Sequence, residues 1–218
     1  MAIYIPPSFA CAKRAAIARL VHDYPFATLI TPGAPEPWLS HVPLILCADR
    51  EPHGTLIGHV ARANPHWQHM QGPESIAIFH GPHAYVSPAW YREPAQAVPT
   101  WNFTAVHAHG KIDLIDDSAA TRGVLDVLVK RFEGGRAEPW TFAMAERPRD
   151  ALVGAIVAFR LRITRLDVKF KLSQNRSRDD RARVIAALKA EGYAEATATA
   201  AWMDEYASPH HDADEPRG

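Results

Sequence analysis

The sequence predicts an α+β protein in which antiparallel strands form a sheet and helices are inserted into it and appended to it. Most of the strand patterns come early and follow one another across short turns, which is unlike an alternating βαβ chain. The chain has 18 prolines, which argue against a bundle of helices. Hydrophobic residues make up 47% of its 218 residues, so we expect a packed core.

The first third of the chain predicts one helix and three strands. Ser8 is placed to cap a helix over residues 9–22, where alanine, isoleucine and leucine recur at helical spacing, and Pro25 ends it. A turn sequence at 32–35 then joins two strands into a hairpin. The strands that we expect here span residues 26–31, 38–46 and 54–61.

The middle of the chain alternates turn signals with strands. Asn64 and Pro65 suit the cap and the first position of a short helix that reaches His69. Gly81 and Pro82 divide the next extended stretch, and Gly110 suggests a bend in a long strand. The strands that we expect here span residues 75–79, 83–87 and 100–115.

The last third is richer in helices. Asp117 and Ser118 open a helix that reaches Phe132, and Ser177 with Asp180 is close to a capping box for another. An alanine-rich helix reaches Tyr206, and we expect residues 208–218 to be disordered. The other elements that we expect are a helix at 150–157, strands at 158–166 and 169–172, and the capped helix at 178–190.

The composition limits the classes of partner. Lysine plus arginine equals aspartate plus glutamate, so the formal net charge is zero and gives no support to direct DNA binding. The two cysteines, Cys11 and Cys47, are too few for a disulfide framework and fit a reducing compartment. The N-terminus has no signal-peptide pattern and the longest apolar run is far too short to cross a bilayer, so we expect a cytoplasmic protein without a membrane anchor.

Five segments together resemble the PaiB-like family of FMN-binding negative transcriptional regulators. They are residues 5–9 (IPPSF), 58–65 (GHVARANP), 81–88 (GPHAYVSP), 99–110 (PTWNF continuing to AVHAHG) and 171–176 (KLSQNR). The resemblance covers all but about the last dozen residues. It implies an antiparallel split β-barrel of the FMN-binding type, similar to pyridoxamine-phosphate oxidases, with flanking and C-terminal helices. It also implies a homodimer, which is the commonest oligomer.

The resemblance divides the chain into three parts and suggests its ligand. We expect a split-barrel FMN-binding domain at 1–176, a helical appendage at 177–206 and a tail at 207–218. The loop at 92–98 is shorter than in many relatives and lacks a lysine that they carry there. FMN is the expected cofactor, and haem is the alternative, because some split barrels bind it instead.

Ten residues are our candidates for cofactor binding. Arg62 and Asn64 lie at a strand-to-helix junction, where an arginine fork and exposed N–H groups suit a phosphate. Lys169 and Lys171 share one face of a strand, which is equally typical of a solvated sheet edge. The full set is His59, Arg62, Asn64, Trp101, Asn102, Lys111, Lys169, Lys171, Ser173 and Gln174.

Alternatives remain open for most of these residues and for the function. Trp101 also suits the core or a dimer interface, and turn chemistry also explains Ser173 and Gln174. His107 and His109 share a strand face and form a weak candidate metal pair with Asp113 nearby. No catalytic constellation is evident, so any activity would be that of the flavin. We predict a regulatory or sensing FMN-binding protein, with a flavin-dependent reductase or oxidase and a haem-binding barrel as alternatives; direct DNA contact is implied only by the family.

Overall fold

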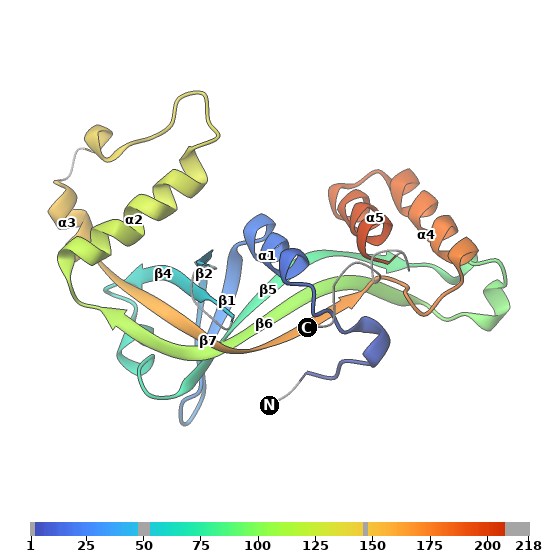
Figure 1. Cartoon of the computed structure of the whole chain (residues 1–218), viewed down its shortest axis with the longest axis horizontal. Helices are drawn as coiled ribbons and strands as arrows, with labels where there is room; N and C mark the ends of the chain where they lie inside the picture. The colour runs from blue at the N-terminus through green and yellow to red at the C-terminus, as the bar shows by residue number, and fades with distance from the viewer. Residues whose placement is uncertain (1–2, 48–52, 146–147, 208–218) are drawn as a thin grey trace, which may run out of the picture. The chain divides into compact units, whose positions relative to one another are not determined.

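The protein is described by a computed structural model that covers residues 3–47, 53–145 and 148–207. Its strands form one antiparallel sheet in the order β2-β1-β5-β6-β7-β4-β3, and β2 and β3 are its unjoined edges (Figure 1). The strands are β1 (Phe26–Thr31), β2 (Trp38–Pro43), β3 (Ile45–Cys47), β4 (Thr55–Ala61), β5 (Glu74–Val86), β6 (Thr100–Ile115) and β7 (Ile156–Lys171). The α-helices are α1 (Arg14–Asp23), α2 (Ser118–Glu133), α3 (Arg149–Gly154), α4 (Arg178–Glu191) and α5 (Ala194–Tyr206). The predicted α+β class and its antiparallel sheet are confirmed.

The chain divides into two compact units. Unit 1 comprises residues 3–17, 80–106 and 168–207, and unit 2 comprises residues 18–79 and 107–167 within the described ranges. The divisions fall inside α1, β5, β6 and β7, so each unit holds a part of this helix and of these three strands.

Unit 2 holds β1 to β4 and the helices α2 and α3. The inward residues of its strands are apolar and fully buried, among them Leu29, Leu56 and Phe79. Helix α2 begins at the predicted cap, because the Asp117 carboxylate accepts a hydrogen bond from Ala120 N at 2.7 Å. Its apolar face packs with Ile115 and Ala158 through Val124 and Leu128. Unit 2 is therefore a strand core with one helix packed on it.

Unit 1 combines strand ends with the two C-terminal helices, which lie side by side (Figure 1). Ser177 caps α4, as predicted, by accepting a hydrogen bond from Asp180 N at 3.1 Å. Helix α5 buries Trp202 and Met203, and the Trp202 ring meets the Phe170 ring of β7 edge-on at 5.5 Å. The helices thus cover the face of β7 that carries Phe170.

Several predicted boundaries are wrong. The helix expected at 9–22 begins only at Arg14, because Ala10 pairs with Lys169 of β7 and Cys11 N donates to Val168 O instead. The strand expected at 38–46 breaks at Leu44. Its first part pairs with β1 and its second part with β4.

Two predicted pairs of strands are single strands. Strand β5 runs through Gly81 and Pro82, because its pairing with β1 ends at Ile78, so that no β1 partner beyond this point needs an N–H from the proline. Strand β7 likewise runs unbroken from Ile156 to Lys171, and the helix expected at 150–157 ends at Gly154.

Three further observations complete the description. Strand β6 is continuous through Gly110, as expected for one long strand. None of the helices in the described residues has the length and apolar character needed to cross a membrane. The expected disorder of residues 208–218 concerns residues that lie outside the described part of the chain.

Candidate functional site

The exposed Arg62 directly follows β4 in unit 2 and is held by hydrogen bonds of both its backbone and its side chain. Its backbone N–H donates to Ala155 O at 2.8 Å, and its Nε and Nη2 donate to Gly154 O at 2.7 Å and Ile156 O at 2.8 Å. Its carbonyl accepts from Trp67 Nε1 at 3.0 Å. These bonds fix the guanidinium through one edge and do not use Nη1, which remains as a donor for an anion.

A chain of buried hydrogen bonds lies directly behind this segment. Asn64 Oδ1 accepts from His66 N at 3.0 Å, and Asn64 Nδ2 donates to Ser40 Oγ at 2.9 Å. The imidazole of His66 bridges Ser40 Oγ (2.8 Å from Nδ1) and Thr31 Oγ1 (2.9 Å from Nε2), and Thr31 Oγ1 lies 2.8 Å from Ser75 Oγ. The predicted capping role of Asn64 is thus confirmed, and three strands hold its segment in place.

The other two candidates of unit 2 differ in exposure. His59 lies opposite Ala158 in the β4–β7 pair, and its buried Nδ1 has no hydrogen-bond partner among the described residues. Burial lowers the pKa of His59, so the neutral ring is favoured. Lys111 is exposed on β6. A ligand role for these two residues stays a prediction.

The remaining six candidates all belong to unit 1, which contains the beginning of β6 and the end of β7. Lys171 Nζ donates to Thr100 Oγ1 and to Trp101 O. Desolvation, and then the charges of Lys169 and Arg176, lower the pKa of the half-buried Lys171. The structure therefore brings Lys171 to Trp101 as part of a cationic, aromatic surface.

Asn102, Ser173 and Gln174 are satisfied within the chain. Asn102 Nδ2 donates to Ser173 Oγ at 2.9 Å and to Met203 Sδ at 3.3 Å, and both Asn102 and Ser173 are buried. Gln174 Oε1 accepts from Leu172 N at 2.7 Å. Ser173 has φ 66°, the left-handed region that serine seldom adopts, so this turn is held by its neighbours. The turn interpretation explains all three side chains, and their contact with a ligand stays a prediction.

Trp101, in contrast to the buried Asn102 and Ser173, is 53% exposed. Its ring lies 6.1 Å from the His83 ring and 6.3 Å from the Tyr85 ring, which is 41% exposed. Lys169 Nζ donates to Tyr4 O at 2.9 Å and lies 5.5 Å from the Phe103 ring centroid. We call His83, Tyr85, Trp101, Lys169 and Lys171 the aromatic face of unit 1.

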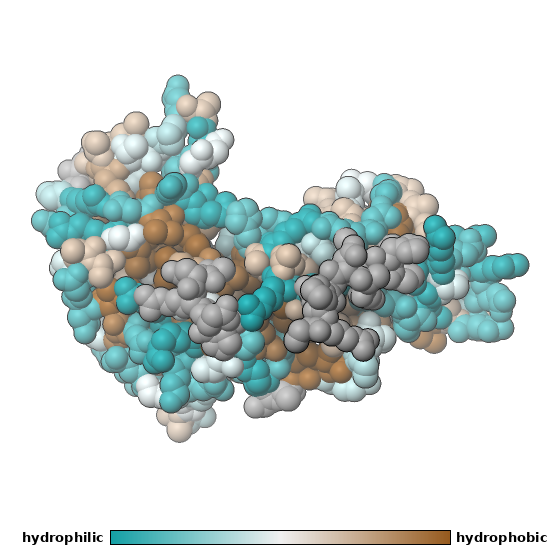
Figure 2. Space-filling view, viewed as in Figure 1, coloured by the Kyte–Doolittle hydropathy of each residue, from teal (hydrophilic) through white to brown (hydrophobic). Residues whose placement is uncertain are grey.

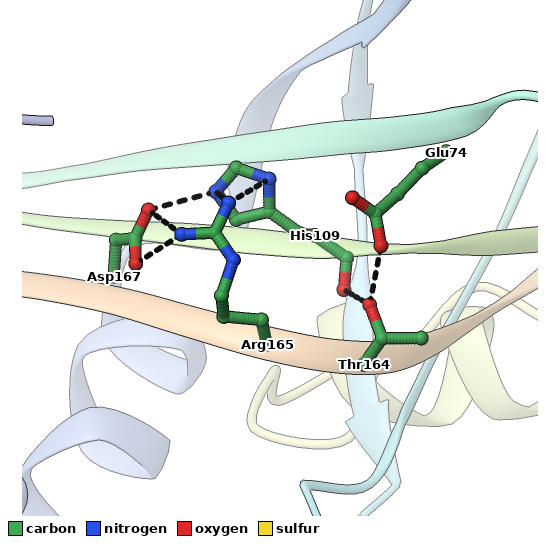
Figure 3. A network of polar contacts seen from close by, with 5 residues as sticks. All are labelled: Glu74, His109, Thr164, Arg165 and Asp167. Carbon is green, nitrogen blue, oxygen red and sulfur yellow. Dashed lines mark hydrogen bonds and ion pairs between the residues drawn. The ribbon is translucent and has the colours of Figure 1, made fainter. Parts of the chain in front are cut away.

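Sequence reasoning missed a second polar network in unit 2 (Figure 3). His109 is buried, and its Nε2 lies 3.0 Å from Asp167 Oδ2. Arg165 bonds to the same carboxylate and places Nη2 3.1 Å from His109 Nδ1. Thr164 Oγ1 donates to Glu74 Oε1 at 2.6 Å and shares the same proton with His109 O, which lies 3.2 Å away.

This network bears on the candidate metal pair formed by His107 and His109 of β6. Both ring nitrogens of His109 face protein partners, and Asp113 pairs with Arg162 at 2.6 Å. Among the described residues, histidine, cysteine and carboxylate side chains nowhere gather in a group of three that could hold a metal ion. The geometry gives His109 a structural ion-pair network instead.

A shallow hollow of about 330 Å³ lies beside α2, where hydrophobic residues reach the surface (Figure 2). Its lining is Cys47, Thr55, Ile57, Ala120, Gly123, Val124, Val127 and Arg160. None of the ten candidate residues is part of this lining. The anchored segment from Arg62 to Trp67 is therefore the best-defined candidate binding element of unit 2.

Comparison with known proteins agrees with this fold. Residues 3–165 match the family described as "Putative FMN-binding domain". The Bacillus subtilis protein "Protease synthase and sporulation protein PAI 2" is 32% identical over 192 residues, which cover 87% of this chain and 90% of that protein. An uncharacterized protein of Aspergillus fumigatus is also 32% identical, over 78% of this chain and 84% of its own length.

Solved structures extend the likeness of fold beyond close relatives. The FAD and heme binding protein from Mycobacterium smegmatis has a TM-score of 0.59 at 18% identity and covers 84% of this chain and 80% of its own. The flavocytochrome Anf3 from Azotobacter vinelandii has a TM-score of 0.60 at 15% identity. The match covers 80% of this chain and 75% of that protein. With a family match over most of its length and a relative of this identity, the chain belongs to the PaiB-like family of FMN-binding-domain proteins with the split-barrel fold.

Proposed function

We propose that this protein binds FMN and that the segment from Arg62 to Trp67 binds its phosphate. The match to the FMN-binding family over residues 3–165 carries this proposal. The local geometry supports it, because Arg62 is exposed, is anchored through Nε and Nη2, and keeps Nη1 for an acceptor. An anchored guanidinium loses little conformational freedom when it binds an anion.

Titration of the purified protein with FMN and with riboflavin tests the phosphate assignment. The two ligands share the ring and differ in the phosphate, so the ratio of their dissociation constants reports the phosphate contact. Arg62→Gln removes a charge-assisted bond, and we expect it to weaken FMN binding roughly tenfold or more and to leave riboflavin binding unchanged. Arg160→Gln removes another exposed arginine of unit 2 and serves as the matched control. Equal loss for both ligands, or no loss in Arg62→Gln, would remove Arg62 from the site.

The visible spectrum of the protein separates the cofactors. Flavin bands would support the proposal, whereas an intense Soret band would favour haem; the structurally similar protein from Mycobacterium smegmatis is a FAD and heme binding protein. Oxidation of NAD(P)H in the presence of added FMN would favour the alternative of a flavin-dependent reductase.

We further propose a regulatory or sensing role. The PAI 2 relative, named for protease synthesis and sporulation, supports it. Direct contact with DNA has no support from charge: net charge is zero, Arg183 pairs with Asp179 at 3.1 Å, and Arg181 donates to Arg176 O at 3.0 Å. A gel shift at physiological salt tests direct DNA binding. If the protein binds DNA without sequence preference and added salt abolishes the binding, specific DNA recognition is refuted.

We also propose that the chain forms a homodimer through the aromatic face of unit 1. The face exposes Trp101 and Tyr85 together, and exposed aromatic groups are enriched at interfaces. Trp101→Arg should convert a dimer to a monomer in light scattering after size exclusion. Trp140→Arg is the matched control, because Trp140 is also exposed, at 37%, but belongs to unit 2. A wild-type monomer, or a dimer that persists in Trp101→Arg, would refute this interface.

A further inference from the structure

We propose that the neutral imidazole of His66 positions the Arg62–Trp67 segment for phosphate binding, so that protonation of this ring weakens the binding of FMN. This inference rests on the proposed function. His66 would act through its neighbours without touching the ligand, so it is a positioning residue.

The hydrogen-bond chain requires a ring that donates through one nitrogen and accepts through the other. Ser40 Oγ already accepts from Asn64 Nδ2 at 2.9 Å, so its own proton suits Nδ1 of His66, 2.8 Å away. Nε2–H of His66 then donates to Thr31 Oγ1 at 2.9 Å, and Thr31 Oγ1 lies 2.8 Å from Ser75 Oγ, with which it shares a further hydrogen bond. Both ring nitrogens have a partner of the matching kind in this arrangement, which is available only to the neutral ring.

A doubly protonated ring would reverse the direction of the hydrogen bond between Ser40 and the ring. Both ring nitrogens would then be donors, and the Ser40 hydroxyl proton would lose its acceptor. The side chains involved are buried: His66, Thr31 and Ser75 are 0% exposed and Ser40 is 7% exposed. A buried group without its partner is costly, so a charged His66 would favour movement of its segment away from the hydroxyl groups of Ser40 and Thr31.

Among the interactions described for His66, none involves a carboxylate that would stabilise the charged ring. Strands β1, β2 and β5 contribute the hydroxyls of Thr31, Ser40 and Ser75, and the Trp38 ring of β2 stacks at 6.4 Å. The titratable group that acts on it is His69, three residues further along the chain, whose electrostatic effect adds to desolvation in lowering the pKa of His66. Glu74, next to Ser75, bonds to Thr164 instead.

Movement of His66 would reach the candidate phosphate contact through two short links. His66 N is bonded to Asn64 Oδ1, the cap of the turn. The next residue, Trp67, donates from Nε1 to Arg62 O at 3.0 Å. The ring, the cap and the arginine are thus joined within the six residues from Arg62 to Trp67, so the state of the ring is transmitted to Arg62.

The experiment measures dissociation constants of FMN and riboflavin between pH 5 and 8 for the wild type, His66→Gln and His41→Gln. Glutamine stays neutral and keeps one donor and one acceptor, so it removes the titration. His41 is the matched control, because its Nδ1 also bonds to a threonine hydroxyl, Thr28 Oγ1 at 3.2 Å, but the residue is exposed. The second ionisation of the phosphate, near pH 6, affects all three proteins alike.

We expect the FMN affinity of the wild type and of His41→Gln to fall more steeply with acid than that of His66→Gln, by up to about tenfold per pH unit below the pKa of His66. Riboflavin should show no such difference between the proteins. Parallel FMN profiles for the wild type and His66→Gln would overturn the proposal. Equal wild-type affinities for FMN and riboflavin at pH 8 would instead refute the phosphate site itself, and with it this role of His66.

A measurement on the wild type keeps the proposal testable if His66→Gln does not fold. Linkage requires that a ligand which binds only the neutral form lowers the pKa of His66 further. Histidine NMR signals followed through a pH titration should therefore show a lower pKa of His66 with saturating FMN than with riboflavin. An unchanged titration of His66 would overturn the proposal.

Discussion

Gly110→Ala should strongly destabilise the fold, because β6 and β7 approach each other closely at this glycine. A Cβ at residue 110 would lie 2.2 Å from Arg162 O and 2.5 Å from Leu161 Cδ2. Ordinary contact begins at 3.4 Å, so the shortfall from the carbonyl oxygen is 1.2 Å. The leucine can rotate, but the carbonyl belongs to the strand backbone, so β7 itself would have to move. Overpacking costs about 1–3 kcal/mol, and a backbone clash places this site at or above about 3 kcal/mol.

Gly123→Ala supplies the opposite expectation in the same unit. This glycine lies within α2, and a Cβ there meets no atom within 4 Å. Alanine should stabilise the protein by about 0.5–1 kcal/mol, since glycine is the poorer helix former. Urea unfolding of both variants measures the difference directly. If Gly110→Ala lowers the free energy of unfolding by less than about 1 kcal/mol, the close approach inferred for β6 and β7 is refuted.

Three further outcomes can be measured in the same way. His59→Leu removes a buried ring nitrogen that has no partner among the described residues, so stability should be retained or rise by up to about 1 kcal/mol; a loss of FMN affinity without loss of stability would instead mark His59 as a ligand contact. Asp117→Ala removes the cap of α2 and should cost about 1 kcal/mol in the free energy of unfolding. Burial lowers the pKa of both His59 and His66 from 6.5, so the unfolded chain binds protons first and stability should fall as pH drops below about 6.5; a flat profile between pH 7 and 5 in His59→Leu/His66→Gln, against a falling wild type, would confirm the source.

The elements that the sequence predicted well are those with local signals. Strand β1 and the long strand β6 have the predicted bounds, and the caps at Asp117 and Ser177 form as expected. Caps and strand patterns depend on residues within one turn or one pleat, so a single sequence contains their cause. The same applies to Asn64, whose role as a cap follows from its position before a proline.

The wrong boundaries arise from partners that are distant in sequence. Residues 10 and 11 bond to β7 in place of starting a helix, and Leu44 marks the change of partner from β1 to β4. Pro82 stays inside β5 because no registered β1 residue faces it there. Each outcome is decided by the neighbouring strand, which local propensity does not specify.

The candidate site divides in a similar way, and the division shows what the resemblance could and could not assign. The polar run at 173–174 looks like a ligand loop, yet Ser173 bonds to Asn102 and takes a left-handed backbone that favours a turn. Conversely, Thr31 and Ser40 stand at inward positions of their strands beside Leu29 and Val42, and polar residues at core positions signal a buried network. The alternation of apolar and polar residues in β1 and β2 already contained these two polar positions. Their partner could not be predicted from it, because the His66 ring that bridges the two strands lies elsewhere in the sequence.

Satisfaction of hydrogen bonds therefore separates the candidates better than residue type does. A polar side chain whose donors and acceptors are all used inside the protein gains little from a ligand, because binding would first have to break those bonds. Arg62 differs, since it is anchored by one edge of its guanidinium and exposed with the other. An arginine held in this way combines a fixed position with unused donors, which is what a phosphate contact requires. The strongest binding candidate of unit 2 is thus the residue that is both fixed and incompletely satisfied, and the buried chain through His66 is what keeps its segment in place.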